Sequence, residues 1–170
     1  MVTWNNTDEP IAYLITFRTY GTWLAGDERG SIDRFHNTYG GRRAVVSPAR
    51  ESIHSNRLMS VPFLLDAPTR GVVDRTIREV FEFRNWPLLA LHVRTNHAHL
   101  VSGASTSSAI ILRDVKSYST RRLREAGLWS HKHSPWVDKG SRRNLWNEQH
   151  VLAACDYVIN GQGRPLPDFD

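Results

Sequence analysis

Cysteine is almost absent from this sequence, because Cys155 is the only one among its 170 residues. An intramolecular disulfide is therefore excluded, and we expect the protein in a reducing compartment such as the cytoplasm. No apolar run approaches the roughly 20 residues of a membrane span, and the opening residues, MVTWNNTDEP, lack the pattern of a signal peptide. We therefore expect no membrane association. Internal repeats and low-complexity tracts are also missing, which excludes a repeat architecture.

The composition is that of an ordinary globular domain with a basic excess. Hydrophobic residues make up 40% and charged residues 23% of the chain, and its length suits a single domain over residues 1–170. Lysine and arginine number 22 against 17 aspartates and glutamates, which gives a formal charge of +5. This balance favours an acidic partner, nucleic acid first, although a basic protein without such a partner has the same composition.

Hydrophobic periodicity predicts an alternation of strands and helices. After the first strand, residues 24–65 show no sustained period, and we expect an irregular insertion there. The predicted elements are a strand at 11–23, a helix at 66–86, a hairpin of strands at 87–95 and 97–103, a helix at 106–127, short strands within 134–147 and a helix at 148–161. This order predicts an α+β fold, a ferredoxin-like two-layer sandwich of an antiparallel sheet with helices on one face.

Residues typical of helix ends support these boundaries. Asp66 and Asn147 are the expected N-caps of the first and last helices, and Thr106 or Ser107 caps the middle one. Gly127 is the expected stop of the middle helix.

The stretch NHAHLVSG, residues 96–103, places two histidines one residue apart in a predicted strand. Strand side chains alternate between faces, so His97 and His99 point the same way, while Ala98 and Leu100 point toward a core. Two imidazoles about 7 Å apart along one face can converge on a divalent cation when a third ligand comes from elsewhere. Two surface histidines that bind nothing are the alternative that the motif alone leaves open.

The stretch VRTNHAHLV resembles the His-hydrophobic-His signature of the HUH single-strand nucleases. More narrowly, it resembles the single-tyrosine transposases of small insertion sequences and the REP-associated tyrosine transposases. The similarity covers most of the chain in element order, including a late helix that carries a tyrosine. The opening AYLITFRTYGTWLAGDERGS is also similar to a subgroup of transposase-like bacterial proteins.

This resemblance implies metal-dependent cleavage and strand transfer of single-stranded or hairpin DNA. A divalent cation, Mg²⁺ or Mn²⁺, would sit on His97, His99 and a third polar side chain and polarise the scissile phosphate. A tyrosine would attack, forming a 5′-phosphotyrosine link and freeing a 3′-hydroxyl. A phenol needs such assistance, because its pKa of about 10 makes it a poor nucleophile at neutral pH.

The family's nucleophile lies on the helix after the last strands, and Tyr157 matches that place. The resemblance therefore implies Tyr157 as the catalytic residue, with Tyr118 of the middle helix as the alternative. In the family a side-chain amide often follows the tyrosine by four residues, and here that position is Gly161. Gln162 is then the preferred third ligand over Asn160. If neither reaches the cation, the resemblance implies an impaired enzyme.

Two basic clusters are candidates for binding DNA phosphates. Trp136 and Trp146 bracket the second cluster, and exposed aromatic rings offer stacking platforms for unpaired bases. A solvated helix face and buried tryptophans are the alternatives. The clusters are Arg121, Arg122 and Arg124 on the middle helix, and Lys139, Arg142 and Arg143 in DKGSRRNLW.

Two other functions compete with the strand transferase. One is a nucleic-acid-binding protein of the same fold without chemistry, which the glycine at position 161 motivates. The other is a metal hydrolase of small phosphoesters, for which the sequence offers too few carboxylates near His97 and His99. A monomer and a homodimer both remain open, as do the role of the insertion and the DNA sequence recognised.

Overall fold

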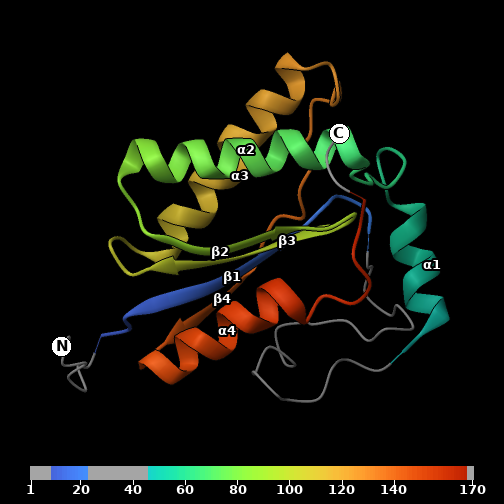
Figure 1. Cartoon of the computed structure of the whole chain (residues 1–170). Coiled ribbons are helices and arrows are strands. Elements are labelled where there is room, and N and C mark those ends of the chain that lie inside the picture. Colours follow the sequence, from blue (N-terminus) through green and yellow to red (C-terminus); the bar gives the residue numbers. More distant parts are fainter. Residues whose placement is uncertain (1–8, 23–45, 168–170) are drawn as a thin grey trace.

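A four-stranded antiparallel sheet forms the centre of the computed structural model, which describes residues 9–22 and 46–167. The strands lie in the spatial order β2-β3-β1-β4, and each neighbouring pair is antiparallel (Figure 1). Their bounds are β1 Ala12–Arg18, β2 Leu88–Val93, β3 His97–Gly103 and β4 Ser141–Leu145. The predicted α+β fold with an antiparallel sheet is confirmed.

The two faces of the sheet are covered by different helices (Figure 1). α2 (Ala67–Arg84) and α3 (Ser108–Glu125) pack together over one face, and α4 (Glu148–Asn160) covers the opposite face. The sheet with α2 and α3 is the predicted two-layer sandwich, and α4 adds a cover on its other side. Within the described ranges, no helix has the length and hydropathy of a membrane span.

Alternation along the strands gives the sheet two different faces. The face toward α2 and α3 carries the larger apolar core, with fully buried Ile15, Phe17, Ala98 and Leu100. The face toward α4 is apolar only in part, because Leu14 and Val101 lie under α4 and the register then brings Thr16 beside His99. The C-terminal end of α4 therefore meets a polar part of the sheet.

Capping side chains begin the helices where the sequence predicts. Asp66, Asn147 and, of the two candidates for α3, Ser107 each accept a hydrogen bond from a backbone N–H of the first turn. Gly127 follows the end of α3 with a φ of 70°. This left-handed conformation favours glycine, since it has no Cβ to clash.

The predicted irregular insertion at 24–65 contains a helix, so that prediction is wrong for its later part. α1 (Pro48–Asn56) has Ser47 as its N-cap and a proline at its first position, which is a favoured helix start. No side chain of α1 is buried, so the segment lacks the apolar periodicity by which helices are recognised. Residues 24–45 of the insertion lie outside the described residues.

Candidate active site

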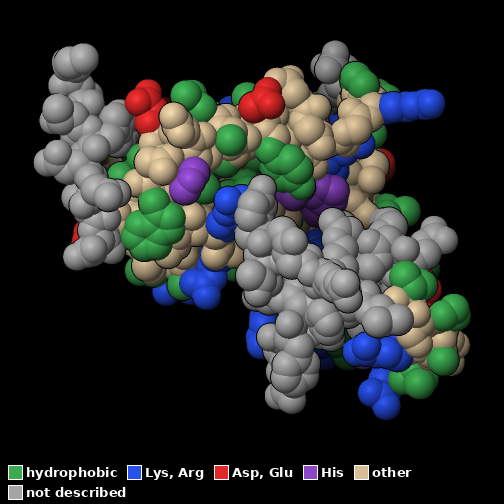
Figure 2. All heavy atoms as spheres, turned by 90° about the horizontal axis from the view of Figure 1, so that it is seen from below, with side chains coloured by type: hydrophobic (Ala, Val, Ile, Leu, Met, Phe, Trp, Pro, Cys, Tyr) green, Lys and Arg blue, Asp and Glu red, His purple; other side chains and the backbone are tan. Residues whose placement is uncertain are grey.

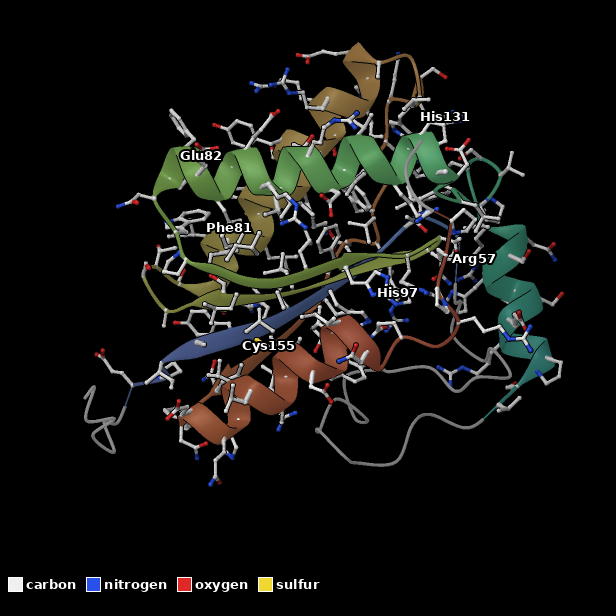
Figure 3. All side chains as sticks on the ribbon, in the orientation of Figure 1. Arg57, Phe81, Glu82, His97, His131 and Cys155 are labelled. Carbon is white, nitrogen blue, oxygen red and sulfur yellow. The ribbon has the colours of Figure 1, made fainter. Side chains whose placement is uncertain are left out.

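His97 and His99 lie side by side on the α4 face of β3, as strand alternation predicts. Their ring centroids are 4.5 Å apart, and the ring planes meet at 76°. His97 lies between the sheet and the C-terminal end of α4 (Figure 3), and His99 is the more deeply buried of the two, with 7% exposure. Seen from the α4 side, histidine side chains reach the surface of the molecule next to Lys and Arg side chains (Figure 2).

Each of these imidazoles is held at its Nδ1 atom. Asn96 Oδ1 lies 2.6 Å from Nδ1 of His97, and Thr16 Oγ1 lies 2.6 Å from Nδ1 of His99. An amide oxygen only accepts hydrogen bonds, so the His97 ring donates its Nδ1–H to Asn96 and carries its lone pair on Nε2. Outer partners of this kind fix the tautomer and the orientation of imidazoles that bind metals.

Gln162 brings an amide oxygen to the Nε2 atom of His97. The Gln162 Nε2 donates to the backbone carbonyl of Tyr157 at 2.9 Å, which orients the amide. Its Oε1 then lies 3.4 Å from Nε2 of His97. A neutral imidazole has one N–H, and the shorter contact with Asn96 takes it, so two lone pairs face each other across this gap. A cation between them would satisfy both atoms at once.

Both imidazoles are neutral at pH 7. Burial lowers the pKa of His97 from 6.5 to about 4 and the pKa of His99 to about 3. The contact with Gln162 raises the pKa of His97, and the charges of Arg94 and Arg18 lower it. Metal ions bind the neutral form of imidazole, so at neutral pH neither ring has to lose a proton before a cation binds.

Tyr157 of α4 lies against the histidine pair. Its ring centroid is 5.4 Å from that of His99, edge to face, and its exposed fraction is 46%. The next residue, Val158, is fully buried against the sheet and fixes this turn of the helix. Tyr118 packs instead on the α2–α3 side, with its ring 4.8 Å from the guanidinium of Arg121. The structure therefore brings Tyr157 to the histidines and separates Tyr118 from them by the sheet.

Gly161 makes the tight turn that carries Gln162 to the site. A Cβ on residue 161 would lie 2.7 Å from the carbonyl oxygen of Tyr157 and 2.9 Å from Cδ2 of its ring, so this position requires glycine. The Asn160 amide instead donates at 2.8 Å to the carboxylate four residues earlier in α4, and it is exposed. Of the two candidate ligands, Gln162 is the one that lies beside the histidines.

The donor set suits a divalent cation that also binds water or a phosphate. Two imidazole nitrogens and one amide oxygen are three ligands, and they leave further coordination positions open. The described ranges contain no group of three or more His, Cys, Asp or Glu side chains that could hold a metal ion. A three-ligand site at this place would therefore take the amide oxygen of Gln162 as its third ligand.

His92 of β2 also faces α4 and was not expected from the sequence. It pairs with His99 across the strands, and its Nδ1 lies 3.0 Å from the backbone carbonyl of Val158. The last four carbonyls of a helix have no partner within the helix, so His92 donates to one of them and ties the end of α4 to the sheet. This contact of His92 with α4 depends on the strand register and on the packing of the helix, and local sequence patterns show neither.

The first predicted basic cluster divides between two surfaces. Arg121 and Arg124 line a hollow on the outer side of α3. Arg122 turns toward α2, where it pairs with Glu79 at 3.2 Å, and it also contacts Glu125 at 3.4 Å. The structure therefore brings together two of the three arginines, and the third links the two helices.

The second predicted basic cluster is spread around the edge strand β4. Arg142 and Arg143 are successive residues of this strand, so their side chains point to opposite faces. Lys139 is exposed in the preceding loop, and Trp146, 41% exposed, follows the strand. Trp136 is only 2% exposed and belongs to the core, which is the alternative that the sequence left open.

Comparison with solved structures found chains of similar path. A REP-associated tyrosine transposase bound to a REP hairpin has a TM-score of 0.47 and 11% identity, over 93% of this chain and 70% of that one. A candidate transposase from Deinococcus radiodurans R1 has a TM-score of 0.46 and 13% identity, over 97% of this chain and 100% of that one. No family model and no curated protein matches the sequence. The chain is thus similar in path to these two structures at low sequence identity.

Proposed function

We propose that the protein cleaves and rejoins single-stranded DNA through a covalent link to Tyr157, with a divalent cation held by His97, His99 and Gln162. The observation that carries this proposal is the 3.4 Å approach of His97 Nε2 and Gln162 Oε1, which are both acceptors when His97 donates its Nδ1–H to Asn96. The tyrosine ring lies beside them, 5.4 Å from the ring of His99. Polar groups of a purely structural pair are normally satisfied within the fold, so two opposed lone pairs favour a bound cation.

The chemistry of such a site balances without any further reactant. Mg²⁺ or Mn²⁺, when bound, stabilises negative charge on the phosphate oxygens. The phenolic oxygen of Tyr157 forms a bond to the phosphorus as the P–O3′ bond breaks. The phenolic proton leaves to solvent, and the departing 3′ oxygen takes up a proton. Attack of a 3′-hydroxyl on the 5′-phosphotyrosine reverses these steps and joins two strands.

The surroundings of the site suit an anionic polymer. Arg18 and Arg94 lie close enough to lower the pKa of His97, so two positive charges stand beside the imidazole pair. The chain as a whole carries a formal charge of +5. Phosphate neutralisation by such groups drives nucleic-acid binding. Single-stranded or hairpin DNA in the cytoplasm is the substrate we propose, and a site built from one chain serves a monomer or a homodimer.

A nucleic-acid-binding protein without chemistry is the second candidate, and Gly161 favours it. The family that the sequence resembles often has a side-chain amide four residues after its tyrosine, and this chain has a glycine there. The amide of the next residue, Gln162, takes its place. A weak third ligand would leave DNA binding intact and remove cleavage. This candidate predicts salt-sensitive DNA binding that survives His97→Ala, with no cleavage under any metal.

Incubation with single-stranded oligonucleotides and Mn²⁺, followed by a denaturing gel, tests the proposal. Wild-type protein should form a covalent protein–DNA adduct. Tyr157→Phe should form none, and Tyr118→Phe, the matched control on the other side of the sheet, should form as much as wild type. An adduct that persists in Tyr157→Phe removes Tyr157 from the mechanism. Absence of any adduct across a library of hairpin and unstructured oligonucleotides supports the second candidate.

A further inference from the structure

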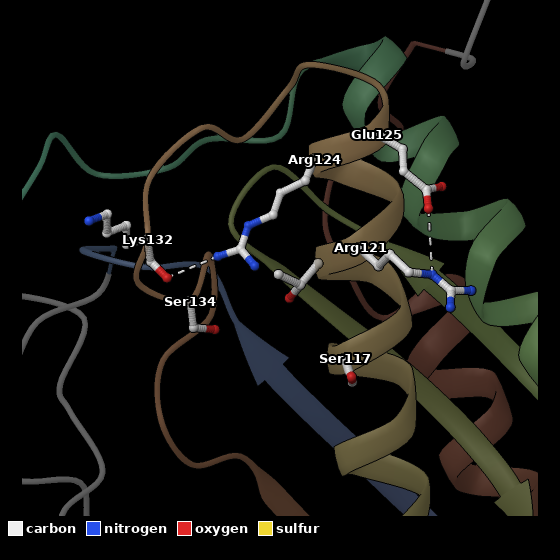
Figure 4. Close-up of a pocket in the computed structure, with 7 residues that line it drawn as sticks. Ser117, Arg121, Arg124, Glu125, Lys132 and Ser134 are labelled. Carbon is white, nitrogen blue, oxygen red and sulfur yellow. Dashed lines mark hydrogen bonds and ion pairs between the residues drawn. The ribbon is translucent and has the colours of Figure 1, made fainter.

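A hollow of about 520 Å³ opens on the outer side of α3, away from the histidine pair. The segment that follows α3 forms its opposite wall (Figure 4). Its walls carry three cationic and three hydroxyl side chains, those of Arg121, Arg124, Lys132, Ser117, Thr120 and Ser134. Cations combined with hydroxyl donors are the groups that bind phosphate oxygens.

Arg124 is an ordered cation at the centre of this hollow. Its Nη2 donates to the backbone carbonyls of His131, Lys132 and His133, at 3.1, 2.9 and 3.4 Å. Figure 4 shows the contact with Lys132. The Nε and Nη1 of Arg124 have no hydrogen-bond partner within the described part of the chain. A guanidinium already fixed on one edge loses little freedom when its other edge binds an oxyanion.

The fold neutralises the charge of the hollow only in part, because its three cations face one carboxylate in the lining. Glu125 is its one carboxylate among the described residues, and it lies 3.7 Å from Arg121 and 3.4 Å from Arg122. The ammonium of Lys132 has no partner in the described ranges. The hollow is therefore positive and open to solvent, as a site for an anion has to be.

A flat ring is carried by His131, which is next to Lys132 in the chain and whose carbonyl accepts a hydrogen bond from Arg124. His131 is exposed, and its ring stacks on that of His133 with centroids 5.2 Å apart and an angle of 16°. Trp129, 5% exposed, supports it with a ring centroid 4.8 Å away and is itself fixed by a hydrogen bond from Nε1 to the carbonyl of His133. Rings held in place like this are stacking platforms for unpaired bases. His131 thus offers an exposed ring for base stacking, whereas the ring of Trp136 is buried.

The hollow and the histidine pair lie at the same end of the sheet, on opposite sides of it. Pro135 accepts from the backbone N–H of Tyr20 at 2.7 Å, and the neighbouring Thr19 donates to Asn96 at 2.9 Å. Two inter-strand spacings, about 10 Å, therefore separate the wall of the hollow from the backbone next to His97. In Figure 3, His131 lies on the α2–α3 side of the sheet and His97 on the α4 side, toward the same end.

We propose that this hollow is a second nucleotide subsite for single-stranded DNA. One backbone phosphate binds the open edge of Arg124, and a neighbouring base stacks on His131. Arg121 and Lys132, whose charged ends point away from Arg124 on either side of it (Figure 4), each contact an adjacent phosphate of the same strand, a few nucleotides from the phosphate at the histidine pair. The identity of the polymer as DNA rests on the proposed function. The subsite holds the strand as it passes around the end of the sheet, so it adds affinity without taking part in the chemistry.

Binding of a fluorescent single-stranded oligonucleotide to Tyr157→Phe, measured by anisotropy over a range of salt, tests the phosphate contacts without cleavage. Adding Lys132→Gln or Arg121→Gln should weaken binding and reduce the slope of log K against log salt by about 0.7, the value for one lost phosphate contact on a single strand. Arg78→Gln, which removes one charge from the outer side of α2, is the matched control and should leave the slope unchanged. Equal slopes in all three variants would overturn the proposal.

His131→Ala tests the base contact separately. It should weaken binding several-fold with an unchanged salt slope, because stacking releases no counterions. An oligonucleotide that lacks the base expected to stack on residue 131 should bind the His131→Ala variant and the protein with His131 equally well. Full affinity in His131→Ala would remove the stacking part of the proposal. These results are independent of catalysis. If wild type forms the adduct but the Lys132 and Arg121 variants keep the wild-type salt slope, the subsite alone is contradicted. If these variants have reduced salt slopes but wild type forms no adduct, the proposed function alone is contradicted.

Discussion

The amide oxygen of Gln162 lies 3.4 Å from Nε2 of His97, and in the tautomer that donates Nδ1–H to Asn96 neither atom has a proton to give the other. The amide cannot turn over without losing its bond to the carbonyl of Tyr157 at 2.9 Å. The last turn of α4 thus orients the proposed third ligand, Gln162, as well as the tyrosine. A cation bound here would connect the sheet to the segment that follows α4.

Substitution of Gln162 should change metal affinity in both directions. Gln162→Ala removes the amide oxygen and should weaken Mn²⁺ binding about tenfold or more, whereas Gln162→Glu adds a charged oxygen and should strengthen it. Asn160→Ala is the control, since that amide bonds within α4. Isothermal titration with Mn²⁺ measures all three. Equal affinities in the Gln162 variants and wild type would exclude this residue as a ligand.

Thr16 and Asn96 should matter for metal binding although neither is expected to touch the ion. Each holds an imidazole at Nδ1, at 2.6 Å. Thr16→Val and Asn96→Ala should each lower Mn²⁺ affinity about 10- to 100-fold, the usual effect of losing a partner that orients a ligand. Asn144→Ala, on the exposed edge strand, should have no effect. Unchanged affinity in both variants would mean that burial alone orients the rings.

Stability should fall as the pH drops below neutrality, in part because of the two histidines. Burial lowers the pKa of His97 from 6.5 to about 4 and that of His99 to about 3, so the unfolded chain binds protons first. Their contribution is complete above pH 6.5 and is lost progressively toward pH 4 and below. Urea midpoints of wild type and His97→Gln, measured across this window, should show a flatter pH dependence in the variant. Parallel plots of urea midpoint against pH for the two proteins would contradict the lowered pKa of His97.

Gly161→Ala should disturb the site without touching any proposed ligand. The added Cβ would meet the carbonyl oxygen of Tyr157 at 2.7 Å, so the turn after α4 has to shift. We expect both slower adduct formation and weaker Mn²⁺ binding, because the turn positions Tyr157 and Gln162 together. Asn160→Ala should retain both properties. Wild-type behaviour of Gly161→Ala would show that the turn is tolerant and that the two residues are positioned independently.

Features set by neighbouring residues were predictable from the sequence, and features set by docking were not. The caps Asp66 and Asn147 and the common face of His97 and His99 follow from local rules. The same strand alternation that places the two histidines together also points Arg142 and Arg143 in opposite directions. Closeness in the sequence had nevertheless suggested that the two arginines form one cluster.

The remaining features of the site depend on how segments distant in the sequence pack together. Thr16 reaches His99 across 83 residues of sequence, which only the strand register determines. α4 lies on the face opposite α2 and α3, so the tyrosine it carries reaches the histidines directly. The helix α1 has no buried side chain and therefore no periodic pattern to detect.

The most direct test of the account is the position of Mn²⁺ in a crystal of the protein soaked with that ion. Anomalous scattering should place one ion on Nε2 of His97, Nε2 of His99 and Oε1 of Gln162, at about 2.0–2.3 Å from each. The Tyr157 side chain should lie at the edge of its coordination sphere. No anomalous peak between these atoms at saturating Mn²⁺, or an ion bound elsewhere while these atoms stay without one, would contradict the account.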